Sequence, residues 1–176
     1  SSMETSAGRM VEEVVLPAYG WEVVPSSMHS AESVLDGRKS GAGNDFFGAT
    51  LKSGPRCLND EMAKDIGRDV VAHASTWAAS HHSPYVEFTY GVLYGTKKQS
   101  NKKDWHILRN IAEALPTGAE IISSHKSGWS ITYVLSGLRV EATVRVGLDW
   151  WNYLGGQDAW LEVCLALIRA CIDPVG

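Results

Sequence analysis

Hydrophobic residues recur every three to four positions in four stretches of the chain, the spacing that gathers them on one face of an α-helix. These stretches predict helices over residues 4–19, 59–79, 104–115 and 157–172. In the first helix the apolar positions are Met10, Val11, Val14, Val15 and Ala18. The second begins at Asn59, a residue type that caps helix N-termini, and Pro116 closes the third.

Runs rich in β-branched and aromatic residues lie between these helices and predict strands. The runs cover residues 21–24, 33–39, 45–53, 85–95, 119–124, 129–135 and 138–146. Small polar residues at 40–44 indicate a hairpin turn between two of them, and Ser136-Gly137 indicates another. The 85–95 run carries few charges, which is typical of a central strand buried on both faces.

The predicted elements follow the order α, β, β, β, α, β, α, β, β, β, α. No internal repeat and no long linker interrupts them. The expected fold is therefore a single α/β domain over residues 4–176, with a mixed central β-sheet flanked by helices on both faces. Ser1, Ser2 and Met3 look like an expression remnant and do not enter this prediction.

The predicted hairpin makes a geometric prediction about two charged residues. If its turn centres on Gly43, residues whose numbers sum to 86 face each other, so Asp36 lies opposite Thr50. Lys52 projects from the same face two residues further along. Asp45 cannot take the place of Asp36, because it lies seven residues before Lys52 on one strand, roughly 23 Å away at about 3.3 Å per residue.

The next predicted helix adds two acids. Glu61 and Asp65 are spaced i, i+4, so they share a helix face shortly after Lys52. With Asp36 and the backbone carbonyl of Leu51, they would offer the hard oxygen ligands that Mg²⁺ prefers, with Mn²⁺ as a substitute. A lysine beside such a site would activate water for attack on a phosphodiester. Otherwise the two acids belong to a solvated helix face.

The spacing of these residues resembles a known motif. Asp36, thirteen intervening residues and then Thr50-Leu51-Lys52 are similar to the signature of the PD-(D/E)xK nucleases, which include most type II restriction endonucleases. The resemblance covers roughly residues 4–95 and implies a restriction-endonuclease-like αβββαβ core. It also implies a magnesium-dependent endonuclease that hydrolyses DNA phosphodiester bonds in both strands at specific sequences.

Thr50 departs from the family pattern, because the middle position usually holds an acid. In one branch of restriction enzymes the acid comes instead from the following helix, about thirteen residues after the lysine. Asp65 matches that offset, and Glu61 lies one turn earlier.

The family's first helix often supplies a Glu near the metal; Glu12 fits that position best, ahead of Glu4 and Glu13. The alternatives left open are a catalytically inactive nuclease-fold domain that binds DNA or another partner, and a structure-specific repair nuclease.

Overall charge gives no support to a general attraction for nucleic acid. Sixteen Lys and Arg residues stand against twenty Asp and Glu residues, a formal net charge of −4. Two local segments nevertheless carry groups suited to phosphates and base edges. The candidate DNA-binding residues in them are Lys97, Lys98, Gln99, Asn101, Lys102, Lys103, His125 and Lys126.

The remaining expectations concern partners and location. Cleavage of duplex DNA needs two sites, so a homodimer is expected, with the aromatic region 150–160 as its interface. No apolar run approaches the roughly 18 residues that cross a membrane. Cys57, Cys164 and Cys171 lack metal-ligand spacing and are expected to be buried thiols, which favours a reducing, cytoplasmic location.

Overall fold

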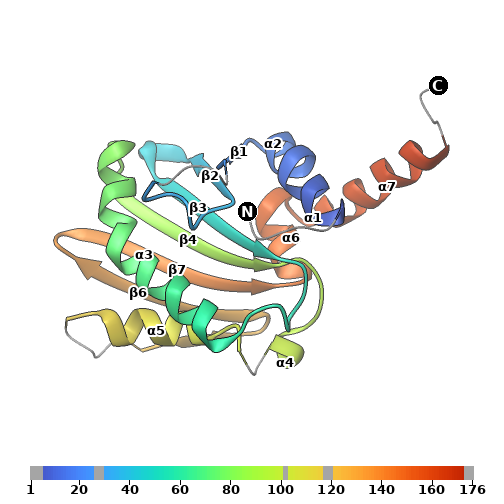
Figure 1. The fold of residues 1–176 in the computed structure, drawn as a ribbon. Coiled ribbons are helices and arrows are strands. Elements are labelled where there is room, and N and C mark those ends of the chain that lie inside the picture. Colours follow the sequence, from blue (N-terminus) through green and yellow to red (C-terminus); the bar gives the residue numbers. More distant parts are fainter. Residues whose placement is uncertain (1–5, 26–29, 101–102, 117–120, 173–176) are drawn as a thin grey trace.

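A seven-stranded mixed sheet forms the centre of the molecule in the computed structural model, which describes residues 6–25, 30–100, 103–116 and 121–172 (Figure 1). The spatial order of the strands is β1-β2-β3-β4-β7-β6-β5. Their bounds are β1 Glu22–Val23, β2 Gly37–Ser40, β3 Phe46–Lys52, β4 Tyr85–Val92, β5 Ser123–His125, β6 Gly128–Leu135 and β7 Leu138–Val146. The predicted single α/β domain with a mixed sheet is confirmed.

The three central strands are parallel and the outer ones are antiparallel. β4 pairs in parallel with β3 on one side and with β7 on the other, although β4 and β7 are far apart in sequence. β1, β2 and β3 form one antiparallel set, and β7, β6 and β5 form the other. The carboxyl ends of β3, β4 and β7 therefore lie at one end of the sheet.

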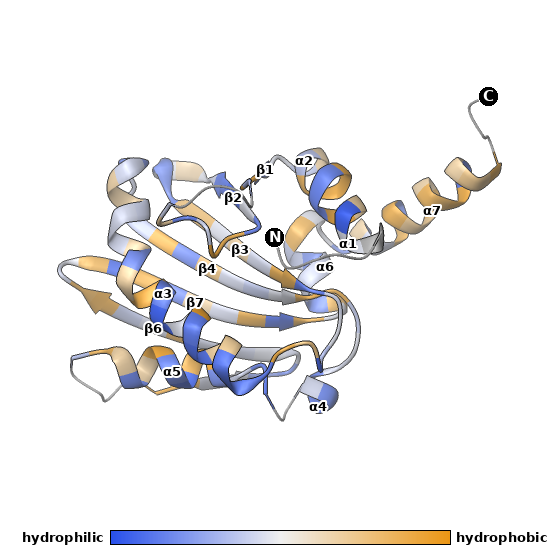
Figure 2. Ribbon diagram, in the orientation of Figure 1, coloured by the Kyte–Doolittle hydropathy of each residue, from blue (hydrophilic) through white to orange (hydrophobic). Residues whose placement is uncertain are grey.

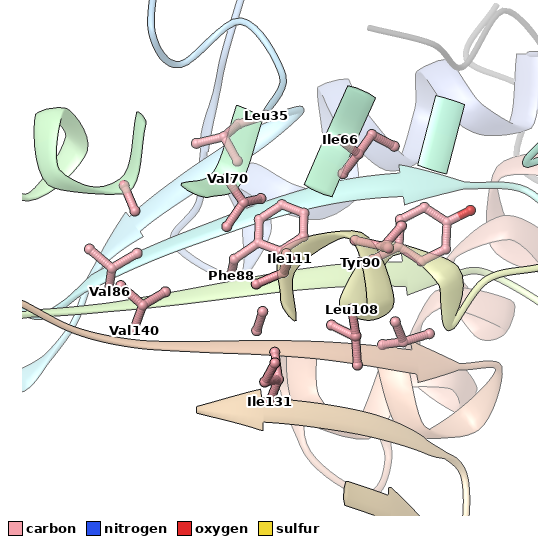
Figure 3. Close-up of a cluster of buried hydrophobic side chains, with 14 of the residues drawn as sticks. Leu35, Ile66, Val70, Val86, Phe88, Tyr90, Leu108, Ile111, Ile131 and Val140 are labelled. Atoms are coloured by element: carbon pink, nitrogen blue, oxygen red, sulfur yellow. The ribbon is translucent and has the colours of Figure 1, made fainter. Parts of the chain in front are cut away.

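Helices cover both faces of this sheet (Figure 1). Their bounds are α1 Ser6–Met10, η1 Val11–Val15, α2 Leu16–Ala18, η2 Ala42–Asn44, α3 Asp60–Ser80, α4 Lys97–Ser100, α5 His106–Ala114, α6 Leu148–Gly155 and α7 Ala159–Ile172. α3 and α5 pack together over one face, where Val70, Phe88, Leu108 and Ile111 belong to the larger core cluster (Figure 3). η1, α2 and α6 contribute to a second cluster on the opposite face.

The first predicted helix is not a regular α-helix. Between α1 and α2 the chain forms a π-helical turn, η1, in which the backbone N–H of Leu16 donates to the carbonyl of Val11. A π-helical turn holds one more residue than an α-helical turn, and such turns occur often at functional sites. Residue periodicity predicts a helix here but does not distinguish the two kinds of turn.

The carboxyl-terminal third also differs from the prediction. α6 was not expected, and it buries Trp150 and Trp151 in the second core cluster. Trp150 and Trp151 thus belong to the interior, whereas Trp160 is 43% exposed, and the dimer interface expected over region 150–160 stays a prediction. Only the short β5 falls within the predicted 119–124 strand, and 119 and 120 lie outside the described residues. Part of the predicted DNA-binding segment around residues 97–103 is the helix α4.

The cysteines are free thiols but are not buried. Cys57 and Cys171 are exposed and Cys164 is partly exposed, which corrects the expected burial. For Cys164 and Cys171 the reason is that α7 presents only Ala159 and Val163 to the core. Within the described ranges, no helix has the length and apolarity needed to span a bilayer, and hydrophilic and hydrophobic residues mix along most elements (Figure 2).

Candidate active site

The β2–β3 hairpin has the register that the sequence predicts. Gly37 pairs with Ala49 and Arg38 with Gly48, so paired residue numbers sum to 86. Beyond these pairs the backbone N–H of Asp36 also donates to the carbonyl of Ala49, at 2.8 Å. Asp36 and Gly37 thus both lie opposite Ala49, and two residues opposite one form a β-bulge. The regular β2–β3 ladder therefore ends beside Asp36.

Asp36 is a buried carboxylate held by the backbone of β3. The residue is only 3% exposed, and its Oδ2 accepts a hydrogen bond of 2.7 Å from the N–H of Leu51. Burial, together with the nearby charge of Glu12, raises the pKa of Asp36 to about 6, against the lowering effects of the Leu51 hydrogen bond and of Lys52. This combination of burial and a charged partner is typical of functional sites.

Lys52 ends β3 as a second buried charge. The residue is 6% exposed, and burial lowers the pKa of its ammonium group although Asp36 and Glu12 raise it. Among the residues that the structure describes, the Lys52 ammonium group has no hydrogen-bond partner and no carboxylate within 4.0 Å. A lysine whose pKa is lowered exchanges a proton more readily near neutral pH.

Glu12 approaches Asp36 and Lys52 from the helical layer on the other face of the sheet. It lies in the π-helical turn η1, is 6% exposed, and interacts electrostatically with Asp36 and Lys52. Glu12, Asp36, Thr50 and Lys52 are four of the eight buried polar residues among those described. The structure therefore gathers the hairpin residues with the acid of the first helix, whereas Glu13 is exposed and Glu4 lies outside the described residues.

A cavity of about 300 Å³ lies between β3 and the first turns of α3. Its lining consists of Ser33, Val34, Asp36, Thr50, Lys52, Met62, Asp65 and Ile66. Of the two candidate helix acids, the described lining includes Asp65 but not Glu61. The N-cap positions this part of α3, because the Asn59 side chain accepts a hydrogen bond from the N–H of Met62 at 2.8 Å.

Thr50 does not offer a free hydroxyl to this cavity. Its Oγ1 donates to the carbonyl of Val34 at 2.8 Å and thereby holds the segment before Asp36 against β3. The hydroxyl has a structural role at the position where the nuclease motif usually carries an acid. A second acidic ligand beside Asp36 must therefore come from another element.

The carboxylates near the cavity are the type of ligand that Mg²⁺ prefers. Their number also matches what Mg²⁺ sites commonly use. Asp36 and Asp65 line one cavity, whereas Leu51 contacts Asp36 through its backbone N–H and not through the carbonyl that the sequence suggested as a ligand. No group of three or more His, Cys, Asp or Glu side chains able to hold a metal ion occurs in the ranges that the structure describes. Mg²⁺ sites often use one or two carboxylates, with water and substrate phosphate completing the shell, and two carboxylates meet that need.

The two predicted DNA-binding segments lie together. Lys97 Nζ donates to the Ser124 hydroxyl and to the His125 carbonyl, and it lies 4.8 Å from the centre of the Trp129 ring. This ammonium group therefore joins α4 to the β5–β6 hairpin. Lys98 is exposed.

Other candidate DNA-binding residues have local partners or lie outside the described part. Gln99 Oε1 accepts from the N–H of Thr96, and Lys103 pairs with Asp60 at 3.3 Å. Lys126 is exposed, and the His125 ring hydrogen-bonds to the Ser130 hydroxyl. Asn101 and Lys102 lie outside the described residues. The exposed cations available for contact are thus Lys98 and Lys126.

The basic segments and Lys52 share one end of the sheet. The N–H of Leu93 donates to the Lys52 carbonyl just before α4 begins. On the other side of β4, the N–H of Gly147 donates to Val92, and that of Val146 to Ser127 in the β5–β6 turn. Ligands of α/β proteins commonly bind at the carboxyl ends of parallel strands. Sequence spacing alone could not show this neighbourhood, because it depends on the parallel pairing of β4 with β7.

Sequence analysis missed a second polar cavity at this end. It measures about 500 Å³ and includes Glu141, Thr143, Arg145 and Asp149 in its lining. Arg145 pairs with Glu87 at 3.8 Å and with Asp149 at 3.6 Å. The alternation of polar residues along β7 was the available signal, since such residues share one strand face.

Comparison with models of protein families and with curated protein sequences finds no match to this chain.

Proposed function

We propose that the chain is a magnesium-dependent DNA endonuclease of the PD-(D/E)xK type, similar to type II restriction enzymes. The observation that carries the proposal is the β3–α3 cavity, in which buried Asp36 and Lys52 meet Asp65. The element order supports it, since a helix, three antiparallel strands, a helix and a parallel strand β4 correspond to the αβββαβ core of that family.

Each residue has a chemical role in this proposal. Asp36 and Asp65 would hold Mg²⁺, and Glu12 would add negative charge beside them. The bound metal would supply positive charge to the leaving oxygen. Lys52 orients the attacking water and takes up its proton, for which its lowered pKa suits it. Lys98 and Lys126 contact backbone phosphates.

The test is cleavage of phage DNA by the purified protein with Mg²⁺, analysed as a fragment ladder. Asp36→Asn and Lys52→Met are the test variants, and both keep nearly the shape of the original side chain. Asp45→Asn is the matched control, because Asp45 lies beyond the opposite end of β3. We expect discrete bands from the wild type and from Asp45→Asn, and a loss of at least roughly 100-fold in rate from the test variants.

A catalytically inactive nuclease-fold domain that binds DNA is the second candidate. The observation that favours it is Thr50, whose hydroxyl is engaged by Val34 where an acid would usually stand. Wild-type protein that binds DNA but does not cut with Mg²⁺ or Mn²⁺ would support this candidate and contradict the nuclease proposal. Cleavage confined to branched or damaged DNA would instead identify a structure-specific repair nuclease.

A further inference from the structure

The second polar cavity, beside β7, has no part in the proposed cleavage reaction. It measures about 500 Å³, which lies within the usual range of small-molecule sites, and its described lining shares no residue with the β3–α3 cavity. Glu141, Thr143 and Arg145 alternate along β7 and line it. The residues between them belong to the core under α3 and α5, so these three point to the other face of the sheet.

Two buried polar groups of this cavity lack a hydrogen-bond partner among the described residues. One is the hydroxyl of Thr143, a residue only 5% exposed, and the other is Nε of Arg145. Ser130 pairs with Thr143 across the sheet, but its hydroxyl is engaged by the His125 ring at 2.6 Å. Because native proteins rarely leave buried polar groups unpaired, the two atoms indicate a ligand that accepts hydrogen bonds.

The guanidinium group of Arg145 is held in place without being saturated. Its carbon lies 4.2 Å from the centre of the Tyr153 ring, and its terminal nitrogens lie 3.6 Å from Asp149 and 3.8 Å from Glu87. Both ion-pair distances exceed the roughly 3.2 Å that limits a good N–H···O hydrogen bond. Arg145 and Asp149 therefore offer a ligand one donor and one acceptor side by side.

The formal charges of the lining cancel. With His125 neutral, Lys126 and Arg145 stand against Glu141 and Asp149. A bare phosphate or carboxylate group inside the cavity would meet two carboxylates of like charge. The lining instead suits an uncharged group in which a hydrogen-bond acceptor lies directly beside a donor.

We propose that this cavity binds a guanine base. Guanine is uncharged, and its O6 acceptor adjoins its N1–H donor. In this arrangement O6 accepts from Nε of Arg145 and from the Thr143 hydroxyl, while N1–H and the exocyclic amino group donate to Asp149. Arginine is also the side chain that most often makes specific contacts with guanine. Lys126 is exposed and contacts the phosphate of a guanine nucleotide.

This inference does not rest on the proposed nuclease activity, because no residue of the β3–α3 cavity takes part in it. Calorimetric titration of the full chain with GMP tests it, and AMP is the matched ligand. Adenine carries an amino group where guanine has O6 and an acceptor where guanine has N1–H, so both contacts are reversed. We expect GMP to bind at least about 100-fold more tightly than AMP. Equal affinities would overturn the proposal.

Thr143→Val separates binding from folding. The substitution removes the hydroxyl but keeps the shape of the side chain, so GMP should bind about tenfold more weakly. The hydroxyl has no partner in the unliganded chain, so the urea midpoint should not fall. Thr132→Val is the matched control, because Thr132 is an exposed residue of β6 outside the described lining, and it should leave GMP affinity unchanged.

Two results with Thr143→Val would contradict the proposal. Unchanged GMP affinity would show that the base does not contact Thr143. A fall in the urea midpoint would show that the hydroxyl has a partner within the folded chain, which removes the reason for expecting a ligand there.

The guanine base could come from a free nucleotide or from a nucleic acid strand. A single-stranded thymine oligonucleotide with one central guanine, compared with the all-thymine strand, distinguishes these sources when both are measured without Mg²⁺. Binding of GMP identifies the free nucleotide as a sufficient ligand, and a preference for the guanine strand without GMP binding identifies nucleic acid. Either result supports the proposal, and no preference for guanine in either form would overturn it.

Discussion

At the scale of single residues, the buried carboxyl group of Asp36 sets a pH dependence of stability. Burial raises its pKa from 3.8 to about 6, so the folded chain keeps this proton up to a higher pH than the unfolded chain does. The contribution of Asp36 to stability is therefore fully present below about pH 4 and is lost as pH rises through about 6.

Asp36→Asn should consequently stabilise the protein above pH 6. The gain in unfolding free energy is at most about 3 kcal/mol, at 1.36 kcal/mol per pKa unit, and no gain is expected below pH 4. Urea denaturation at pH 4 and pH 8 measures it, with the exposed Asp65→Asn as the control. A variant that is less stable than wild type at pH 8 would show that the ionised carboxylate stabilises the fold. Under the proposed function the same variant is inactive, which is a common conflict between stability and activity.

The two helix acids, one turn apart, make a second prediction. Asp65 lines the cavity with Asp36 and Lys52, whereas Glu61 does not. Asp65→Asn should therefore weaken Mg²⁺-dependent cleavage by about tenfold or more, as loss of one metal ligand does, and Glu61→Gln should change it little. Initial rates measured across a Mg²⁺ titration would separate them. The reverse order of effects would mean that α3 turns or shifts when metal binds.

Much of this site was predictable because alternation along a strand is strict. A pairing sum of 86 predicts that Asp36, Thr50 and Lys52 share one face of the hairpin. The observed pairs of residues 37–40 have that sum, and the three side chains line one cavity although Asp36 itself lies beyond the pairs. Alternation could not show the bulge at Asp36 or the engagement of the Thr50 hydroxyl by Val34. Both depend on backbone atoms of a neighbouring segment, which leave no periodic signal in the sequence.

At the scale of elements, helices α3 and α5 approach closely because a glycine lies between them. A Cβ added to Gly67 would lie 2.8 Å from the carbonyl oxygen of Ile107 and 2.8 Å from Cβ of Asn110. Gly67→Ala should thus lose about 1–3 kcal/mol of stability, although alanine is the better helix former by about 1 kcal/mol. Thermal or urea unfolding measures it. An increase in stability would mean that the two helices separate without cost.

Elements that interrupt a regular pattern were the hardest to predict. α6 is only eight residues long, and glycines with positive φ lie on both sides of it, Gly147 at 62° and Gly156 at 87°. So short a segment shows too few turns for periodicity to stand out. The π-helical turn η1 differs from an α-helix by one residue, yet it carries Glu12. The long helix α3 was predicted to within one residue at each end, and β4 was predicted from its first residue but three residues too long.

At the scale of the whole molecule, the fold gathers cations at one end although the chain carries a formal net charge of −4. Lys98 and Lys126 come from segments far apart in sequence and are both exposed there. If the proposed function holds, replacing both with alanine should lower the slope of log affinity against log salt concentration by about 0.9 for each lost phosphate contact.

DNA binding measured at several salt concentrations gives this slope. Arg139→Ala, compared with each single lysine variant, is the charge-matched control, because Arg139 lies at the start of β7, at the opposite end of the sheet. It should leave the slope unchanged. Equal effects of the lysine and arginine variants would indicate diffuse attraction of DNA to the whole surface.

The parallel pairing of β4 with β7 also governs the order in which the protein can assemble during synthesis. Residues 33–66 already supply the cavity lining, and β4 follows soon afterwards. One edge of β4 nevertheless stays unpaired until β7 has left the ribosome, about fifty residues later. An open, apolar strand edge invites pairing with other chains. The nascent chain thus passes through a stage in which all residues that line the β3–α3 cavity have been synthesised, while one edge of β4 is still open to pairing with other chains.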